Sequence, residues 1–204
     1  MLLRKLRVKN CIAHYAILGP DPLCKGEYSI ASVRFSDAEP IRNWRNQQIS
    51  ALRQQQQLSK ASQIEYFNNI VAKDFNNDRP KQVLVRFCLE GHLIGYGGIV
   101  HLDWRNLRGE VSFLLETSRT KDHTKYSAEL GIFFHLIKEL AFTKLGLNKL
   151  STEAYAHRAY HVTAIENSGF QREGVLRQQT LLDGKWIDAV VASCLRSDHE
   201  NIVK

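Results

Sequence analysis

One long amphipathic helix, placed between two strands, constrains the topology of this chain most strongly. A strand is predicted over residues 110–116 and another over 149–155. The helix between them ends at Gly146, and its apolar face is formed by Leu130, Phe133, Phe134, Ile137, Leu140, Ala141 and Leu145. Because a helix between two strands requires a crossover connection, we expect these strands to be parallel and adjacent.

The remaining strands are predicted to pair as hairpins. Alternating or β-branched segments occupy residues 28–35, 82–89, 93–102, 174–182 and 185–195. Short turn sequences join them at Glu90-Gly91 and at Asp183-Gly184. Three glycines inside one strand, Gly95, Gly97 and Gly98, indicate a bulge or the close approach of another backbone.

Helical segments are predicted around these strands. Ser36 with Glu39, and Ser62 with Glu65, have the spacing of a capping box. A further helix is predicted over residues 159–167. The order of elements therefore predicts an α/β fold with a mixed, mostly antiparallel sheet and helices on both faces.

Composition is that of one globular domain. The chain has 204 residues, of which 44% are hydrophobic and 24% charged. Its four cysteines form no Cys-x-x-Cys pair, which argues against a zinc site or a disulfide scaffold. We expect no metal and a reducing, cytoplasmic environment. No stretch approaches the length of a membrane span, so no membrane association is expected.

The net charge of +7 is concentrated near the N-terminus. Residues 1–26 hold five basic residues and one acidic residue, so we expect a basic arm, poorly ordered or paired with a sheet edge. Residues 27–198 are expected to form a single domain. An acidic partner is indicated: a nucleic acid, a membrane surface or a phosphate-bearing small molecule. Nucleic acid is not favoured, because no recognisable reading motif is present.

Five short segments, in this order, carry a resemblance to a known family. They cover about residues 28–195 and read Arg42-Asn43-Trp44-Arg45-Asn46, Leu93-Ile94-Gly95-Tyr96-Gly97-Gly98, Ala141-Phe142-Thr143-Lys144-Leu145-Gly146-Leu147, Gly169-Phe170 with Glu173-Gly174, and Asp183-Gly184-Lys185-Trp186-Ile187-Asp188. The chain resembles the GNAT (Gcn5-related) N-acetyltransferases. Within them it is similar to the branch of ribosomal-protein and nucleotide-sugar N-acetyltransferases.

The resemblance implies how acetyl-CoA would bind. A central pair of parallel strands would splay apart, and backbone groups of Leu114, Leu115 and Glu116 would pair with the pantetheine arm. The first turn of the long helix would meet the pyrophosphate, because a helix N-terminus offers unpaired N–H donors. The usual glycines of that loop are absent. Side chains would then replace part of the backbone cradle, or the loop would no longer bind the cofactor; the residues concerned are Arg119, Thr120, Lys121, Thr124, Lys125, Tyr126 and Ser127.

Two other positions differ from the family pattern. Arg158 stands where an asparagine that touches the cofactor is usual, and Ile165 stands where a tyrosine acts as general acid. Because Ile165 cannot donate a proton, another group or water must protonate the leaving thiolate. Tyr160 is the nearest phenol in sequence, and Tyr155 and His157 are the alternatives.

Transfer of an acetyl group to an amine requires a base, because only the neutral amine attacks the thioester. Glu153 is the first candidate, since it lies mid-strand and matches the position of an acceptor-site glutamate in nucleotide-sugar acetyltransferases. Its alternative role is a structural pair with an arginine such as Arg158. Glu110 and His101 are further candidates.

The acceptor is the least constrained part of the prediction. In this fold the first two helices wall the acceptor site, and here they carry Arg42, Trp44, Arg45 and Arg53. These side chains would suit a nucleotide-linked amine, although Trp44 could instead pack in the core. We expect an acetyl-CoA-dependent N-acetyltransferase of a small primary amine, with an amino-sugar nucleotide as one candidate. The alternatives are acetylation of a protein N-terminus and a non-catalytic binding or regulatory module; a homodimer through a free sheet edge also stays open.

Overall fold

The computed structural model describes residues 14–203. Its strands are β1 (Leu23–Lys25), β2 (Tyr28–Ser32), β3 (Val83–Leu89), β4 (His92–Asp103), β5 (Arg108–Leu115), β6 (Lys149–Tyr155), β7 (Gln171–Leu182) and β8 (Lys185–Leu195). Its α-helices are α1 (Ala38–Gln47), α2 (Lys60–Tyr66), α3 (Ala72–Asp74), α4 (His123–Lys138), α5 (Ala159–Asn167) and α6 (Arg196–Val203). A wider helical turn links α2 to α3 over Phe67–Val71, and another extends α4 over Glu139–Lys144.

The strands form one eight-stranded sheet in the order β1-β2-β3-β4-β5-β6-β8-β7. Every neighbouring pair is antiparallel except β5 and β6, which are parallel as predicted. These two strands pair only from Arg108 with Lys149 to Glu110 with Ser151. Beyond that point β5 continues to Leu115 and β6 to Tyr155 without pairing with each other, so the centre of the sheet is split.

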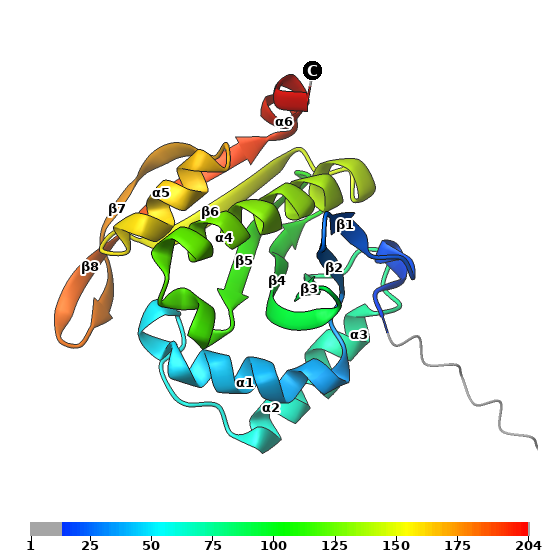
Figure 1. The fold of residues 1–204 in the computed structure, drawn as a ribbon, viewed down its shortest axis with the longest axis horizontal. Helices are drawn as coiled ribbons and strands as arrows, with labels where there is room; N and C mark the ends of the chain where they lie inside the picture. Colours follow the sequence, from blue (N-terminus) through cyan, green and yellow to red (C-terminus); the bar gives the residue numbers. More distant parts are fainter. Residues whose placement is uncertain (1–13, 204) are drawn as a thin grey trace, which may run out of the picture.

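Helices cover both faces of the sheet (Figure 1). The alternation of side chains along β4 shows which helix covers which face. Tyr96 accepts a hydrogen bond at its hydroxyl from Arg45 of α1, at 2.8 Å. A Cβ at the next position, Gly97, would lie 2.7 Å from the ring of Phe133 in α4. Therefore α1 and α4 lie on opposite faces.

The glycines of β4 allow its neighbours to approach closely. Gly98 has a φ of +137°, and a Cβ there would lie 2.0 Å from the carbonyl oxygen of Val83. At Gly97 a Cβ would lie 2.1 Å from the carbonyl oxygen of Ser112. The predicted close approach of another backbone is thus present on both sides of the strand, from β3 and from β5.

Both predicted capping boxes are wrong in detail. At the first, the carboxylate of Asp37 accepts a hydrogen bond from the backbone N–H of Arg34 at 2.9 Å, and α1 begins at Ala38. At the second, α2 begins at Lys60, because Ser59 accepts from the backbone N–H of Ser62 at 3.0 Å. Several Ser, Asp and Glu residues lie near each helix start, and the surrounding fold selects among them.

The described part of the predicted arm packs against the domain. Tyr15 is fully buried, and its backbone N–H donates to the hydroxyl of Ser32 at 3.0 Å. Leu23–Lys25 forms the edge strand β1, which the sequence patterns do not predict. The other basic residues of the arm, Arg4, Lys5, Arg7 and Lys9, lie outside the described residues, and the boundary at residue 26 stays a prediction.

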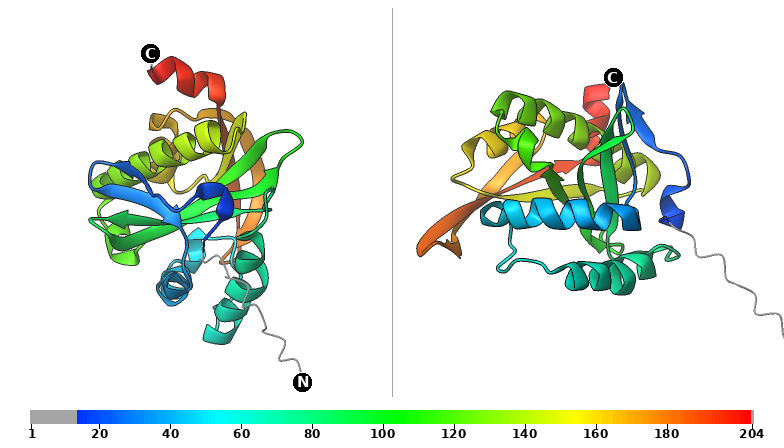
Figure 2. Two further views of the ribbon diagram at one scale, coloured as in Figure 1. Left: turned by 90° about the vertical axis from the view of Figure 1, so that its right-hand side faces the viewer. Right: turned by 60° about the horizontal axis from the view of Figure 1, so that its bottom comes forward.

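A long hairpin ends the sheet on the other side. β7 and β8 join at Asp183 and Gly184, whose φ angles of 48° and 76° are those of the predicted two-residue turn. Figure 2 shows this hairpin extending past the helices. Within residues 14–203, no helix is both long and apolar enough to span a bilayer.

Candidate active site

A cavity of about 400 Å³ lies where β5 and β6 separate. One part of its wall comes from Arg45 of α1 and from Leu52, Arg53 and Gln54 in the following loop, on one face of the sheet. The opposite part comes from Phe134 of α4 and from Arg158, His161 and Ile165 at α5, on the other face. Since residues 111–113 of β5 and 152–155 of β6 also line it, the cavity passes between the two strands.

Two carboxylates meet in this cavity on a single arginine. Nη2 of Arg53 lies 2.9 Å from Oε1 of Glu110 and 3.1 Å from Oε2 of Glu153. The glutamate side chains are 24% and 19% exposed, and that of Arg53 is 50% exposed. Glu110 lies at the last paired position of the parallel strands, and Glu153 lies just beyond it on the other strand. The split in the sheet therefore places one carboxylate on each of its two edges.

The opposite end of the cavity holds a buried polar group between α4 and α5. The hydroxyl of Tyr126 lies 2.9 Å from Nδ1 of His161 and accepts a hydrogen bond from Nη2 of Arg158 at 3.3 Å. Burial lowers the pKa of His161 to about 3, and the nearby charge of Arg158 acts in the same direction. Burial also raises the pKa of Tyr126 to about 12. Near neutral pH this end therefore holds a neutral imidazole, a protonated phenol and one cation.

The first turn of α4 is capped by a carboxylate of this chain. Asp122 accepts hydrogen bonds from the backbone N–H groups of Thr124 and Lys125, at 2.9 and 3.1 Å. A helix N-terminus usually offers these N–H groups to a bound anion. In this protein Asp122 already engages them. The exposed ammonium groups of Lys121 and Lys125 flank the same turn.

A family comparison identifies the fold that carries this cavity. Residues 30–191 match the model of the acetyltransferase (GNAT) domain. The chain belongs to the GNAT acetyltransferases. The members of this family are N-acetyltransferases that use acetyl-CoA, and the predicted family, fold class and enzyme class are confirmed. A search of curated protein sequences finds no match.

Solved GNAT structures share the architecture across most of the chain. One is the spermidine N-acetyltransferase from Vibrio cholerae in complex with CoA and spermine, with a TM-score of 0.72 and 17% identity, covering 87% of this chain and 100% of that one. Another is a chimera of the Vibrio cholerae spermidine N-acetyltransferase and hSSAT, with a TM-score of 0.72 and 17% identity, covering 86% and 99%. At this identity the likeness shows the GNAT fold alone. The narrower branch suggested by the sequence stays a prediction.

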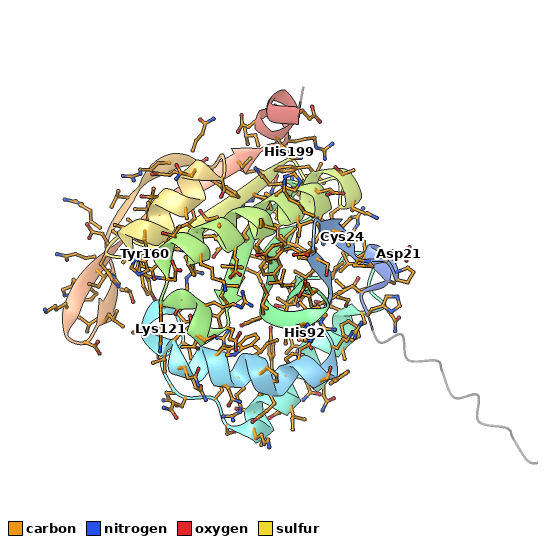
Figure 3. All side chains as sticks on the ribbon, in the orientation of Figure 1. Asp21, Cys24, His92, Lys121, Tyr160 and His199 are labelled. Carbon is orange, nitrogen blue, oxygen red and sulfur yellow. The ribbon has the colours of Figure 1, made fainter. Side chains whose placement is uncertain are left out.

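The structure brings together three of the four predicted catalytic residues. Glu153, Glu110 and His101 all line the cavity, with His101 at an exposed position and a φ of 51°. Tyr160 is not among the lining residues; its ring stacks on His123, with 4.0 Å between centroids. Figure 3 shows Tyr160 and Lys121 near the first turns of α5 and α4. The phenol that lines the cavity is Tyr155, which donates to the carbonyl of Leu52 at 3.3 Å.

Part of the predicted pantetheine-binding backbone has partners within the protein. The N–H of Glu116 donates to the carbonyl of Ile94 at 2.8 Å. The carbonyl of Leu115 accepts from Nε2 of Gln48 at 2.8 Å, so the end of α1 is fastened to the end of β5. Leu114 is buried and pairs with Tyr96 of β4.

The predicted pyrophosphate loop divides into inward and outward side chains. Arg119 turns inward and forms an ion pair with Glu129, whose side chain is 1% exposed. Thr120 donates its hydroxyl to the carbonyl of Thr117 at 2.9 Å, and Tyr126 is buried. The side chains of Lys121, Thr124 and Lys125 are exposed and that of Ser127 is half-buried. The cations that face solvent at this loop are therefore Lys121 and Lys125.

The predicted acceptor-site residues of α1 have different surroundings. Arg42 forms an ion pair with Glu39 at 2.8 Å, and Trp44 packs against the core. Arg45 lines the cavity and donates to Gln54 Oε1 at 2.9 Å and to the Tyr96 hydroxyl at 2.8 Å. Of these three residues, only Arg45 reaches the cavity.

Three contacts at or near the cavity were not anticipated from the sequence. Glu153 pairs with Arg53 of the loop, where the sequence suggested Arg158. Asp122 caps α4, and Gln48 fastens β5. Asp122 directly precedes the helix and could have been found as an N-cap. The Arg53 and Gln48 contacts join residues more than forty positions apart, and no local signal encodes them. Within residues 14–203, no group of three or more His, Cys, Asp or Glu side chains is placed to hold a metal ion.

Proposed function

We propose that this GNAT protein transfers the acetyl group of acetyl-CoA to the primary amine of a small acceptor, with Glu153 removing the proton. The observation that carries the proposal is the cavity between β5 and β6, which has two carboxylates at one face of the sheet. A passage through the sheet lets a thioester approach from the α4 and α5 side and an amine from the α1 side. Acetyl-CoA supplies the activated acyl group.

The protein's residues account for the proton. An amine enters as an ammonium ion and transfers one proton to Glu153, directly or through a water molecule. The neutral nitrogen then forms a bond to the acyl carbon as the carbon–sulfur bond breaks. The nitrogen gives up its second proton to leave the neutral amide, and this proton passes to the departing thiolate directly or through water. Glu110 supports the positive charge before transfer. His161 does not serve as the base, because a pKa of about 3 makes its imidazole a very weak proton acceptor.

Cations at the α4 and α5 end fit the phosphates of coenzyme A. Lys121 and Lys125 are exposed beside the first turn of α4, and Arg158 lines the cavity near the start of α5. The Arg158 guanidinium donates to two neutral hydroxyls, those of Tyr126 and Tyr160. In this proposal, side-chain cations contribute much of the phosphate binding, because Asp122 already engages the helix N–H groups.

The charge of the site favours a small cationic amine over an amino-sugar nucleotide. A diphosphate requires cations without acidic partners, whereas Arg42 is paired with Glu39 and Arg53 with two glutamates. The spermidine N-acetyltransferases of the same fold also act on a small amine, according to their names. Acetylation of a protein N-terminus and a non-catalytic role are the alternatives. The capped α4 and the aliphatic Ile165 are the features that favour the non-catalytic one.

One experiment separates the enzyme from the non-catalytic module. The thermal midpoint of the protein is measured with and without millimolar acetyl-CoA, and a binder is stabilised by mass action. Thiol release is then measured with small amines, amino-sugar nucleotides and peptides as acceptors. We expect a rise in midpoint and thiol release that depends on a small amine. No shift in midpoint would exclude the proposed reaction, and release with peptides alone would point to a protein acceptor.

A further inference from the structure

Arg53 stands between two cavities. The inner cavity is the one between β5 and β6, and an outer cavity of about 780 Å³ lies between the loop after α1 and the β7–β8 hairpin. The two share five lining residues: Leu52, Arg53, Gln54, Glu153 and Tyr155. A molecule that passes from the outer cavity to Glu153 therefore meets the Arg53 side chain on its way.

The carboxylates beside Arg53 attract cations. The charged residues in the wall of the outer cavity are Arg53, Glu153 and Asp183. Where the two cavities meet, Glu110 and Glu153 carry two negative charges against the single positive charge of Arg53. Formally the group is negative even with Arg53 in place. An anionic acceptor would be repelled here, whereas an ammonium group would be attracted.

The guanidinium of Arg53 occupies the position that an ammonium ion would need. Its Nη2 atom touches both carboxylates, at 2.9 and 3.1 Å, which are ordinary distances for a charge-assisted hydrogen bond. The side chain is half exposed and comes from a loop, so it can turn to solvent without uncovering the core. The loop does not depend on the Arg53 side chain for its position. Gln54 forms hydrogen bonds with Arg45 and Asn46, and the Leu52 carbonyl accepts one from Tyr155.

We propose that the acceptor is a cationic amine whose ammonium group replaces the Arg53 guanidinium between Glu110 and Glu153. This inference rests on the proposed function and adds the position that the acceptor's ammonium group takes and a role for Arg53. Arg53 neutralises the carboxylates while the site is empty, and it leaves when the acceptor arrives. The exchange is one cation for another, so the carboxylates never face the cavity unpaired. If Arg53 fills the position nine-tenths of the time, it weakens the apparent affinity for the acceptor about tenfold.

Calorimetric titration of the full-length protein with 1,3-diaminopropane tests the exchange. Arg53→Met removes the charge and keeps an unbranched side chain, and it is expected to bind the diamine about tenfold more tightly than the wild type. Arg53→Lys keeps a cation and is expected to stay close to the wild type. Arg79→Met, at an exposed position in the loop before β3, is the matched control and is expected to leave the affinity unchanged. Adding Glu110→Gln to Arg53→Met should remove the gain.

Opposite results would overturn the exchange. Equal diamine affinity in the wild type and in Arg53→Met would show that Arg53 does not hold the acceptor's position. Glucosamine 1-phosphate provides a second probe, because it carries an amine together with a phosphate. If it binds the wild type and Arg53→Met weakens it, Arg53 binds an anionic acceptor instead. The titrations contain no acetyl-CoA. They therefore test the exchange even if the protein shows no thiol release, which is the measurement that tests the proposed function.

Discussion

The hydroxyl of Tyr126 lies 2.9 Å from Nδ1 of His161 and joins the first turn of α4 to the first turn of α5. This contact holds the two helices that wall one end of the cavity between β5 and β6. The imidazole is buried beside Arg158, and both features favour its neutral form. The helix pair therefore depends on an uncharged His161.

Stability toward acid should depend on His161. Its pKa is lowered from 6.5 to about 3, so between these values the unfolded chain binds a proton that the folded chain does not. Stability from this residue is therefore present above about pH 6.5 and is lost as the pH falls toward 3. We expect His161→Gln to have a shallower loss of unfolding free energy between pH 7.5 and pH 5. Urea unfolding at both pH values measures it.

Other histidines limit the size of that effect. Burial also lowers the pKa of His135 and of His199, so the variant keeps part of the acid dependence. His92→Gln, at an exposed position, is the matched control and should follow the wild type. Equal pH dependence in His161→Gln and His92→Gln would show that the buried imidazole does not carry this linkage.

Substitution of Glu153 should slow turnover without weakening acetyl-CoA binding. Glu153→Gln keeps the shape and removes the base, and loss of a general base lowers kcat about 100-fold or more. Glu110→Gln is the matched variant, and because Glu110 only supports the charge we expect a smaller fall in kcat. Steady-state thiol release measures both, and the thermal shift with acetyl-CoA should persist. Equal turnover in Glu153→Gln and the wild type would remove Glu153 from the mechanism.

The charge of Asp122 should weaken coenzyme A binding. Asp122→Ser keeps a side chain that caps the helix but removes a negative charge next to the expected phosphates. We expect severalfold tighter binding of coenzyme A by calorimetry, with an unfolding free energy within about 1 kcal/mol of the wild type. Asp21→Ser, an exposed acidic position near β1, is the control. Unchanged or weaker binding in Asp122→Ser would place the phosphates away from this turn.

Gly98 should not tolerate a side chain. Its φ of +137° is unfavourable for other residues, and a Cβ would lie 2.0 Å from the backbone oxygen of Val83. We expect Gly98→Ala to lower the unfolding free energy by about 3 kcal/mol or more, because a backbone overlap adds to the strained dihedral. Gly174→Ala is the control, since nothing lies within 4 Å of its Cβ position. Denaturant unfolding that finds the two variants equally stable would contradict this account.

Much of the fold follows from local patterns. The apolar stripe of α4, the apolar and β-branched residues of β3 and β4 and the Asp183-Gly184 turn each reflect interactions between near neighbours in the chain. The parallel pairing of β5 and β6 follows as well, because a crossover helix leaves no other short connection. The short edge strand β1 escaped prediction, because three residues with little apolar alternation acquire their structure only by pairing with β2.

The sequence by itself determined the fold class, the family resemblance and the choice of Glu153 and Glu110 as the central carboxylates. Only the tertiary structure decided the surroundings of these residues. Arg53 reaches both glutamates across 57 and 100 positions of the chain, and Arg119, which the loop sequence offered to phosphate, turns inward to Glu129. The sequence does not show which partner a charged residue will have. Their partners depend on which strands separate and which loop closes over them, and these are properties of the folded chain.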